Sequence, residues 1–332
     1  MKSDDHWFEA GVDAVEDLSP TVRSLVLRPT NGIQPWTVGS HLRVQVDLGG
    51  RSDVRHYSLV GLPQQSRADG CYRIAVKRAD PGRGGSRFMW ALQPGSRVQI
   101  AGPDNQFELP VSAPHTLLVA GGIGITPILG MALTLAARGV SLRMCYAARD
   151  AGELVFAETL RAALGDRLQT FVDASDQRIA LDAEIAALPP GAQMLVCGPV
   201  PLLQAAQEAW ARAGRPAAEL RFETFGSSGS RPAEAFWVRV PRHNVQLEVP
   251  ADRSLLEVLA EHGVEALYDC RRGECGLCAM DIVEVQGTVD HRDVFFSAAE
   301  KRENRRLCAC VSRVSGGGIV IDSAWRADAG AA

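Results

Sequence analysis

Asp269-Cys270-Arg271-Arg272-Gly273-Glu274-Cys275-Gly276-Leu277-Cys278 is the stretch that decides the fold of the C-terminal third of this chain. Its cysteines follow the C-x4-C-x2-C spacing of plant-type [2Fe–2S] sites, whose fourth thiolate comes from further along the chain. Gly273 and Gly276 allow a short loop to wrap its amides around inorganic sulfide without clashing Cβ atoms. The stretch therefore predicts one-electron chemistry at a cluster held by Cys270, Cys275 and Cys278.

Two cysteines are candidates for the fourth ligand, Cys308 and Cys310. In a strand both side chains would point to the same face, so alternation leaves the choice open. The alternative for the whole group is a four-cysteine zinc site. Zinc sites more usually show paired CxxC knuckles, so the spacing favours the iron–sulfur cluster.

Composition sets wide bounds on the rest of the protein. The chain has 332 residues, 46% hydrophobic and 22% charged, with a net charge of −4, which fits two or three ordinary domains and no nucleic-acid partner. Five of the eight cysteines lie between Cys270 and Cys310, a bias that metal binding explains better than disulfides. The start of the sequence does not resemble a signal peptide and no stretch has the length of a membrane span, so we expect a cytoplasmic protein without a membrane partner.

The pattern of strand-forming and helix-forming residues changes along the chain and predicts a multidomain β and α/β protein. Residues 1–109 alternate β-rich runs with turns and contain one expected helix, Ser86 to Leu92, which predicts an antiparallel flavin-binding β-barrel. Residues 110–226 alternate strands and helices, which predicts a parallel-sheet α/β nucleotide-binding domain with helices on both faces. Residues 227–234 have the composition of a linker. Residues 235–332 are expected to form a β-grasp ferredoxin domain, in which Ser254 and Glu257 form a capping box.

Basic and glycine-rich residues in the first segment suggest a phosphate site. Arg55 lies in an expected strand, and the turn from Gly82 to Ser86 offers free amides at a helix start. A terminal phosphate monoester carries about two negative charges, which suits FMN. A solvated basic strand and a flexible turn are the alternative interpretation. The predicted flavin-binding residues are Arg55, His56, Tyr57, Ser58, Ala75, Val76, Lys77, Arg83, Gly84, Gly85 and Ser86.

Glycines of the second segment indicate a dinucleotide site. Gly121-Gly122-Ile123-Gly124-Ile125-Thr126-Pro127 lies between an apolar strand and a helix, where a pyrophosphate can approach the backbone. It departs from the GxGxxG fingerprint of ordinary dehydrogenases. Cys197-Gly198-Pro199 ends a later strand at the same carboxyl edge. Arg149 could hold a 2′-phosphate, but the neighbouring Asp150 and Asp173 oppose one, so we expect NADH.

Taken in order, these motifs resemble the phthalate dioxygenase reductase family over almost the whole chain: RHYS at 55–58, GRGGS at 82–86, GGIGITP at 121–127, CGP at 197–199, FETFG at 222–226 and the cysteine loop. The resemblance implies FMN, NADH and a C-terminal [2Fe–2S] domain that supplies a Rieske non-haem iron oxygenase. It also assigns Cys310, which directly precedes a Val-Ser-Arg segment, as the fourth ligand.

The same resemblance gives roles at the reacting centre. Thr126 would lie near the flavin, Cys197 would line the nicotinamide site, and Phe225 would shield the flavin ring, although Phe225 could equally be a core aromatic. Ser58 or nearby backbone would hydrogen-bond the flavin N5 edge. NADH gives two electrons together as hydride whereas clusters accept one, so a group between them must hold an electron between steps, which a flavin can do.

Two other functions stay open on the sequence. One is an FAD-dependent reductase of a monooxygenase, and the other is a redox-sensing flavin and iron–sulfur binding protein. We expect a partner to dock at an exposed cysteine loop, where Arg271, Arg272 and Glu274 flank the ligands, in a transient, salt-sensitive contact. The alternative is that these charged residues are merely solvated.

Overall fold

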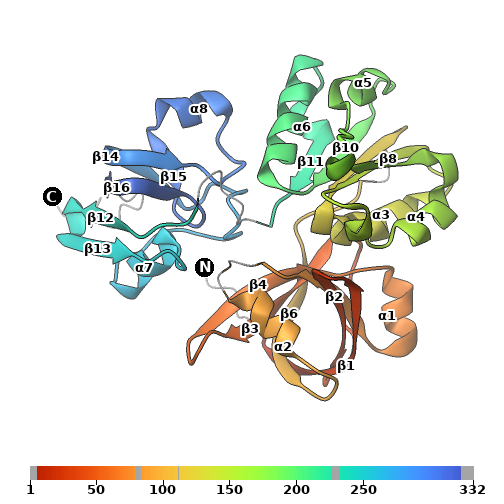
Figure 1. Cartoon of the computed structure of the whole chain (residues 1–332), viewed down its shortest axis with the longest axis horizontal. Coiled ribbons are helices and arrows are strands. Elements are labelled where there is room, and N and C mark those ends of the chain that lie inside the picture. The colour runs from red at the N-terminus through yellow and green to blue at the C-terminus, as the bar shows by residue number, and fades with distance from the viewer. Residues whose placement is uncertain (1–5, 80–81, 83, 111, 226–231, 323–332) are drawn as a thin grey trace. The chain divides into compact units, whose positions relative to one another are not determined.

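The computed structural model describes residues 6–79, 82, 84–110, 112–225 and 232–322. Figure 1 shows its elements along the chain. The chain divides into two compact units, Met1–Glu223 and Thr224–Ala332. Among the described residues, every helix is too short or too polar to span a bilayer.

The first unit begins with a six-stranded antiparallel sheet in the order β4-β3-β6-β1-β2-β5. A bridge between Leu59 and Ile74 links the two end strands, so the sheet curls into a barrel. Alternate side chains such as Leu25, Leu42 and Ile100 fill its interior and are fully buried. The strands are β1 Phe8–Ser19, β2 Val22–Pro29, β3 Ser40–Asp47, β4 Ser52–Ser58, β5 Tyr72–Lys77 and β6 Arg97–Asn105.

Two helices, rather than the one expected, interrupt the barrel: α1 Pro63–Asp69 and α2 Gly85–Ala91. The extra helix α1 begins with Pro63, which fits the first helical turn. It ends at Gly70, whose φ of 72° lies in the left-handed region. Its PQQSRAD sequence lacks apolar periodicity, and Ser66 is its one buried residue, so the pattern gave no signal for a helix.

The second half of the first unit is a five-stranded parallel sheet in the order β11-β10-β7-β8-β9. The central strand β7 is buried along its whole length, as expected of a parallel sheet covered on both faces. Helices pack as the pairs α3 with α4 and α5 with α6, drawn on opposite sides of the sheet in Figure 1. The elements are β7 Thr116–Gly121, α3 Ile125–Ala137, β8 Leu142–Ala148, α4 Ala157–Leu164, β9 Leu168–Val172, α5 Leu181–Ala186, β10 Gln193–Cys197, α6 Val200–Arg212 and β11 Leu220–Glu223.

The second unit is a mixed sheet in the order β13-β12-β16-β14-β15 with one helix packed on it. That helix begins with the predicted capping box, in which Ser254 and Glu257 each accept a hydrogen bond from the other's backbone N–H. The elements are β12 Phe236–Val240, β13 Val245–Val249, α7 Leu255–Glu261, β14 Ala279–Asp290, α8 Ala298–Glu303, β15 Arg306–Cys308 and β16 Arg313–Asp322. The expected fold class is therefore confirmed, while most of the expected linker, residues 227–231, lies outside the described residues.

Candidate functional site

The cysteine loop wraps around the sulfur of Cys270. The backbone N–H groups of Arg272, Glu274 and Cys275 point at Cys270 Sγ across 3.4, 3.4 and 3.5 Å. Burial raises the pKa of the Cys270 thiol to about 11, although these N–H groups oppose the rise. Amides aimed at one sulfur are the arrangement that an iron–sulfur cluster uses to stabilise thiolate charge.

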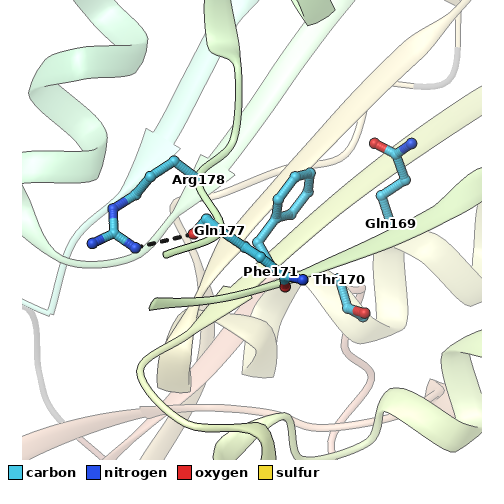
Figure 2. A pocket seen from close by; sticks show the side chains of 5 residues that line it. All are labelled: Gln169, Thr170, Phe171, Gln177 and Arg178. Atoms are coloured by element: carbon cyan, nitrogen blue, oxygen red, sulfur yellow. Dashed lines mark hydrogen bonds between the residues drawn. The ribbon is translucent and has the colours of Figure 1, made fainter. Parts of the chain in front are cut away.

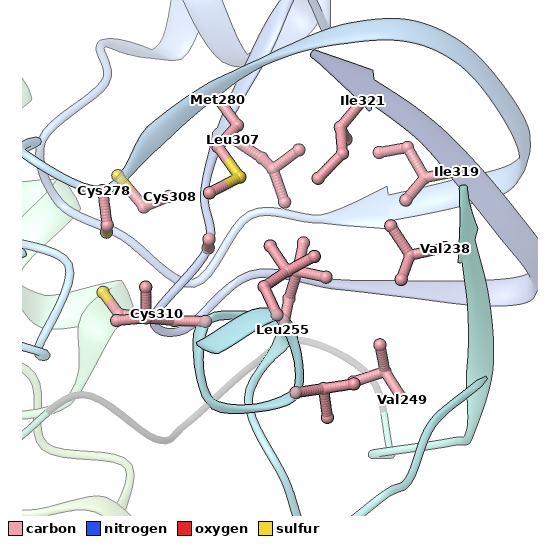
Figure 3. Close-up of a cluster of buried hydrophobic side chains, with 14 of the residues drawn as sticks. Val238, Val249, Leu255, Cys278, Met280, Leu307, Cys308, Cys310, Ile319 and Ile321 are labelled. Atoms are coloured by element: carbon pink, nitrogen blue, oxygen red, sulfur yellow. The ribbon is translucent and has the colours of Figure 1, made fainter. Parts of the chain in front are cut away.

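The other sulfurs gather at one end of the core of the second unit, where Figure 3 shows Cys278, Cys308 and Cys310 together. Cys278 Sγ accepts hydrogen bonds from the thiols of Cys308 and Cys310, and these bonds lower the pKa of Cys278 despite its burial. Cys275 pairs instead with Cys270. Within the described residues, no three His, Cys, Asp or Glu side chains form a group that could hold a single metal ion.

Cys308 and Cys310 differ in a way that alternation did not reveal. Strand β15 ends at Cys308, and hydrogen bonds from Val311 N and Ser312 N to Cys308 O turn the chain back. Cys310 therefore lies in a turn and not in a strand. Its sulfur accepts a hydrogen bond from the N–H of Gly273 in the cysteine loop, whereas Cys308 is fully buried among apolar side chains.

The charged residues of the cysteine loop are not all exposed, which corrects the expectation. The Arg272 side chain is buried and forms an ion pair with Glu274 across 3.3 Å. Glu274 in turn accepts a hydrogen bond from the backbone of Thr224. Arg271 alone among the three is exposed, and its guanidinium lies 4.6 Å above the ring of Tyr268. Arg272 and Glu274 therefore hold the loop together.

Arg55 in β4 has an open donor, as a phosphate site requires. Its Nη1 pairs with Asp53 at 2.7 Å, while its Nη2 is buried and has no hydrogen-bond partner within the described residues. A Cβ built on Gly85 would lie 2.5 Å from Arg55 Nε, so the first turn of α2 packs directly on the guanidinium. Ser86 Oγ accepts a hydrogen bond from Ala79 N at 3.1 Å. The structure thus brings Arg55, Gly84, Gly85 and Ser86 together, while Arg83 lies outside the described residues.

Other predicted flavin residues already have partners in the protein. Lys77 Nζ forms an ion pair with Glu153 at 2.9 Å, so its charge is used between the barrel and the α/β domain. Ser58 is buried and its hydroxyl lies 3.4 Å from Glu223 Oε2. Ala75 and Val76 are buried in β5, and burial raises the pKa of Tyr57 well above its usual range. The ring of His56 lies 5.0 Å from that of His41.

The two glycine-containing loops of the α/β domain contact each other. A Cβ on Gly124 would lie 2.2 Å from the carbonyl oxygen of Cys197, and one on Gly121 would lie 2.8 Å from Pro199 Cδ. Close packing against residues 197–199 therefore requires these glycines, which is a different reason from the expected approach of a pyrophosphate. Gly122, with a φ of 53°, faces open space. Thr126 Oγ1 donates to Ile123 O at 2.9 Å and Cys197 is fully buried.

The residues predicted to determine the preference for NADH over NADPH follow the ends of strands β8 and β9. Arg149 and Asp150 follow β8 and are both exposed, and Asp173 follows β9 and pairs with Arg178 at 2.9 Å. A pocket of about 400 Å³ lies at the edge strand β9. Figure 2 shows the side chains that line it, none of which belongs to the predicted site: Gln169, Thr170, Phe171, Gln177 and Arg178.

Comparison with known proteins places the chain in a family. Residues 238–315 match the 2Fe-2S iron-sulfur cluster binding domain, and residues 9–109 match the oxidoreductase FAD-binding domain. The phthalate 4,5-dioxygenase oxygenase reductase subunit of Pseudomonas putida is 36% identical over 86% of this chain and 87% of its own length. This chain belongs to the phthalate dioxygenase reductase family.

Further relatives agree with this assignment. The heme-dependent oxidative N-demethylase beta subunit of Ectopseudomonas mendocina is 36% identical over 94% of this chain and 97% of its own. The structure of phthalate dioxygenase reductase, described as modular for electron transfer from pyridine nucleotides to [2Fe–2S], has a TM-score of 0.74 and 31% identity over 96% of this chain and 98% of its own. The reductase is therefore an oxidoreductase. Its family is expected to use the flavin FMN, NADH and a [2Fe–2S] cluster. Relatives such as the phthalate 4,5-dioxygenase oxygenase reductase subunit serve oxygenase components.

Two carboxylates of this reductase, the half-buried Glu153 and the buried Asp293, were not anticipated from the sequence. Glu153 accepts hydrogen bonds from Thr21, Ser19 and Lys77, and Asp293 is fully buried below the cysteine loop. Both contact residues far away in the sequence, and neither lies in a motif.

Phe225 is half-buried in the second unit, so its role toward a flavin stays a prediction. Gly226 of the same motif lies outside the described residues.

Proposed function

We propose that this reductase takes hydride from NADH at an FMN site and delivers electrons singly, through a [2Fe–2S] cluster, to a Rieske non-haem iron oxygenase. The strongest support is the loop around Cys270, in which three backbone N–H groups point at the sulfur of that cysteine. Bound flavin supplies the conversion between two-electron and one-electron chemistry. We also propose that the chain consists of a flavin-binding barrel at 1–109, an NADH-binding domain at 110–226, a linker at 227–234 and a ferredoxin domain at 235–332.

The four ligands that we propose are Cys270, Cys275, Cys278 and Cys310. The sulfurs of Cys270 and Cys275 lie together, as do those of Cys278 and Cys310, so the chain offers two pairs of thiolates for two irons. The hydrogen bond from Gly273 to Cys310 supports Cys310 over Cys308.

For the flavin, we propose that Arg83, Arg55 Nη2 and the backbone of Gly84, Gly85 and Ser86 bind the FMN phosphate. Arg55 Nη2, which has no hydrogen-bond partner in the part of the chain that the structure describes, fits a phosphate oxygen, because a buried cationic donor without a partner is costly. Ser58 would orient the flavin ring, and Thr126, Cys197 and Phe225 would border the nicotinamide. His56, Tyr57, Ala75, Val76 and Lys77 would line the flavin site.

An anaerobic titration with NADH tests the electron path. We expect loss of both flavin and iron–sulfur absorbance, with a reduced [2Fe–2S] signal in low-temperature EPR and two irons per chain. A preparation that contains zinc and no iron, with flavin bleaching alone, would contradict the proposal.

Chromatography of the acid-extracted flavin distinguishes FMN from FAD. Slow NADH-dependent reduction of an artificial acceptor would favour a redox sensor.

The nucleotide is tested at Arg149. If NADH is the donor, Arg149→Ala changes kcat/KM for NADH little, because the exposed guanidinium has no 2′-phosphate to bind. Asp150→Ala is the matched variant, and we expect it to reduce the preference for NADH over NADPH. A large loss with NADPH alone, in a wild type that already prefers NADPH, would reverse the assignment.

The partner class is tested by electron transfer. Reduced reductase is mixed anaerobically with a purified Rieske oxygenase and, separately, with a haem oxygenase, since one relative is named as heme-dependent. We expect fast reoxidation of the cluster by the Rieske protein and slow reoxidation by the haem protein. Arg271→Glu should slow the transfer at low salt while NADH oxidation is retained. The opposite order would assign the reductase to a haem partner.

We expect the reductase to act in the cytoplasm. All eight cysteines lie in the described residues and none is in a disulfide, a state that reducing compartments preserve. Recovery of the protein with a periplasmic fraction after cell fractionation would contradict this expectation.

A further inference from the structure

Asp293 is a fully buried carboxylate that lies between the two parts of the proposed cluster site. Its side chain has no exposed surface. A Cβ built on Gly273 of the cysteine loop would lie 2.8 Å from Asp293 Cα, and Val294 N donates to Gly273 O at 2.9 Å. On the other side, the hydroxyl of Ser312, two residues after Cys310, lies 3.4 Å from Asp293 Oδ1. Asp293 therefore contacts both segments that supply the thiols.

Several charged and polar groups contact this carboxylate. Phe296 N donates to Oδ2 at 2.9 Å. Lys301 Nζ lies 3.5 Å from Oδ2 and also donates to the Asp293 carbonyl. His291 Nδ1 lies 3.7 Å from Oδ1, while His291 Nε2 contacts Asn304 Oδ1 at 2.9 Å. Burial opposes ionisation, but the hydrogen bonds and the Lys301 charge hold the pKa of Asp293 below its usual value, so it is a buried anion at neutral pH.

We propose that Asp293 is a positioning residue that also sets the reduction potential of the cluster, with Lys301 as its opposing charge. The inference rests on the proposed function, because it requires a cluster at the cysteine loop. Reduction adds an electron to the cluster, and a nearby buried anion disfavours added negative charge because the protein interior screens it weakly. Asp293 thus lowers the potential, and the Lys301 ammonium raises it.

The test is the midpoint potential, measured by EPR-monitored redox titration of the full chain. Asp293→Asn keeps the shape and the acceptor for Phe296 N but removes the charge. We expect the ratio of reduced to oxidised cluster at a fixed potential to rise about tenfold, which is about 59 mV for one electron. Iron content should stay at two per chain. Glu284→Gln, which removes an exposed carboxylate from β14, should leave the ratio unchanged.

A second variant should shift the reduction potential of the cluster in the opposite direction. Lys301→Gln should lower the same ratio severalfold, while Arg302→Gln, an exposed cation on the same helix, should not change it. A purely structural role for Asp293 predicts no such reversal. Unchanged potentials with full iron, or shifts of both variants in one direction, would overturn the inference. If Asp293→Asn fails to retain iron, the Lys301→Gln titration decides alone. Absence of any cluster in the wild type would instead contradict the proposed function.

Discussion

The backbone N–H of Thr224 donates a hydrogen bond to Oε1 of Glu274 across 2.5 Å, although 50 residues separate them. Glu274 also pairs with the buried Arg272. One carboxylate thus fixes the cysteine loop to the segment that carries Phe225. Within the second unit, the position of that segment depends on the loop that is proposed to hold the cluster.

Glu274→Ala should destabilise the second unit by about 1–3 kcal/mol, because it removes the acceptor for Thr224 N and one charged partner of Arg272. Urea unfolding followed by loss of cluster absorbance measures the effect. Glu265→Ala, an exposed acid close to the loop, is the control and should change stability little. Equal stability of both variants would show that the Thr224 contact contributes nothing.

Glu153 predicts acid sensitivity of the first unit. Burial opposes its ionisation, but hydrogen bonds from Lys77, Thr21 and Ser19 hold its pKa below the usual value. Because the folded pKa lies below the unfolded one, the stabilisation is complete above the unfolded pKa and is lost as pH falls through the folded pKa. Glu153→Gln should therefore cost about 1–3 kcal/mol at pH 7 and progressively less below about pH 4.3. Urea unfolding at several pH values measures this, and a difference that is independent of pH would contradict it.

The two cysteines that alternation could not separate should behave differently on substitution. Cys310→Ala should lose most of the iron and acid-labile sulfide, because a proposed ligand is removed. Cys308→Ala should keep both irons and lose only about 1 kcal/mol of stability from the small cavity. Iron analysis and EPR of the two variants provide the comparison. Full iron in Cys310→Ala, with a changed EPR signal, would assign the ligand to Cys308.

Arg55 should act on the phosphate and not on the flavin ring. Arg55→Ala is expected to weaken FMN binding by about 10–100-fold, the loss of one charged hydrogen bond. Binding of riboflavin, which has no phosphate, should change little. Quenching of flavin fluorescence during titration of the flavin-free protein measures both affinities. Arg28→Ala, an exposed barrel arginine paired with Asp13, is the control, and equal losses for FMN and riboflavin would contradict the phosphate role.

Local patterns predicted many elements because their causes are local. The β-rich runs at 72–77, 236–240 and 245–249 indicate strands β5, β12 and β13 with their observed bounds, and Ser254 with Glu257 indicates the capping box of α7. Strand β1 gives no such signal, because register shifts near Ala14 and Ser19 break its alternation. Helix α5 gives none either, because six residues show too little periodicity.

The sequence by itself determined the fold class, the cysteine loop and the order of the motifs, since spacing and periodicity are properties of neighbouring residues. Only the tertiary structure decided that Gly273 bonds to Cys310, that Lys77 pairs with Glu153 and that Asp293 lies below the cysteine loop. These contacts join residues that are distant along the chain. Their geometry depends on how the sheets and turns pack, and no local pattern records that packing.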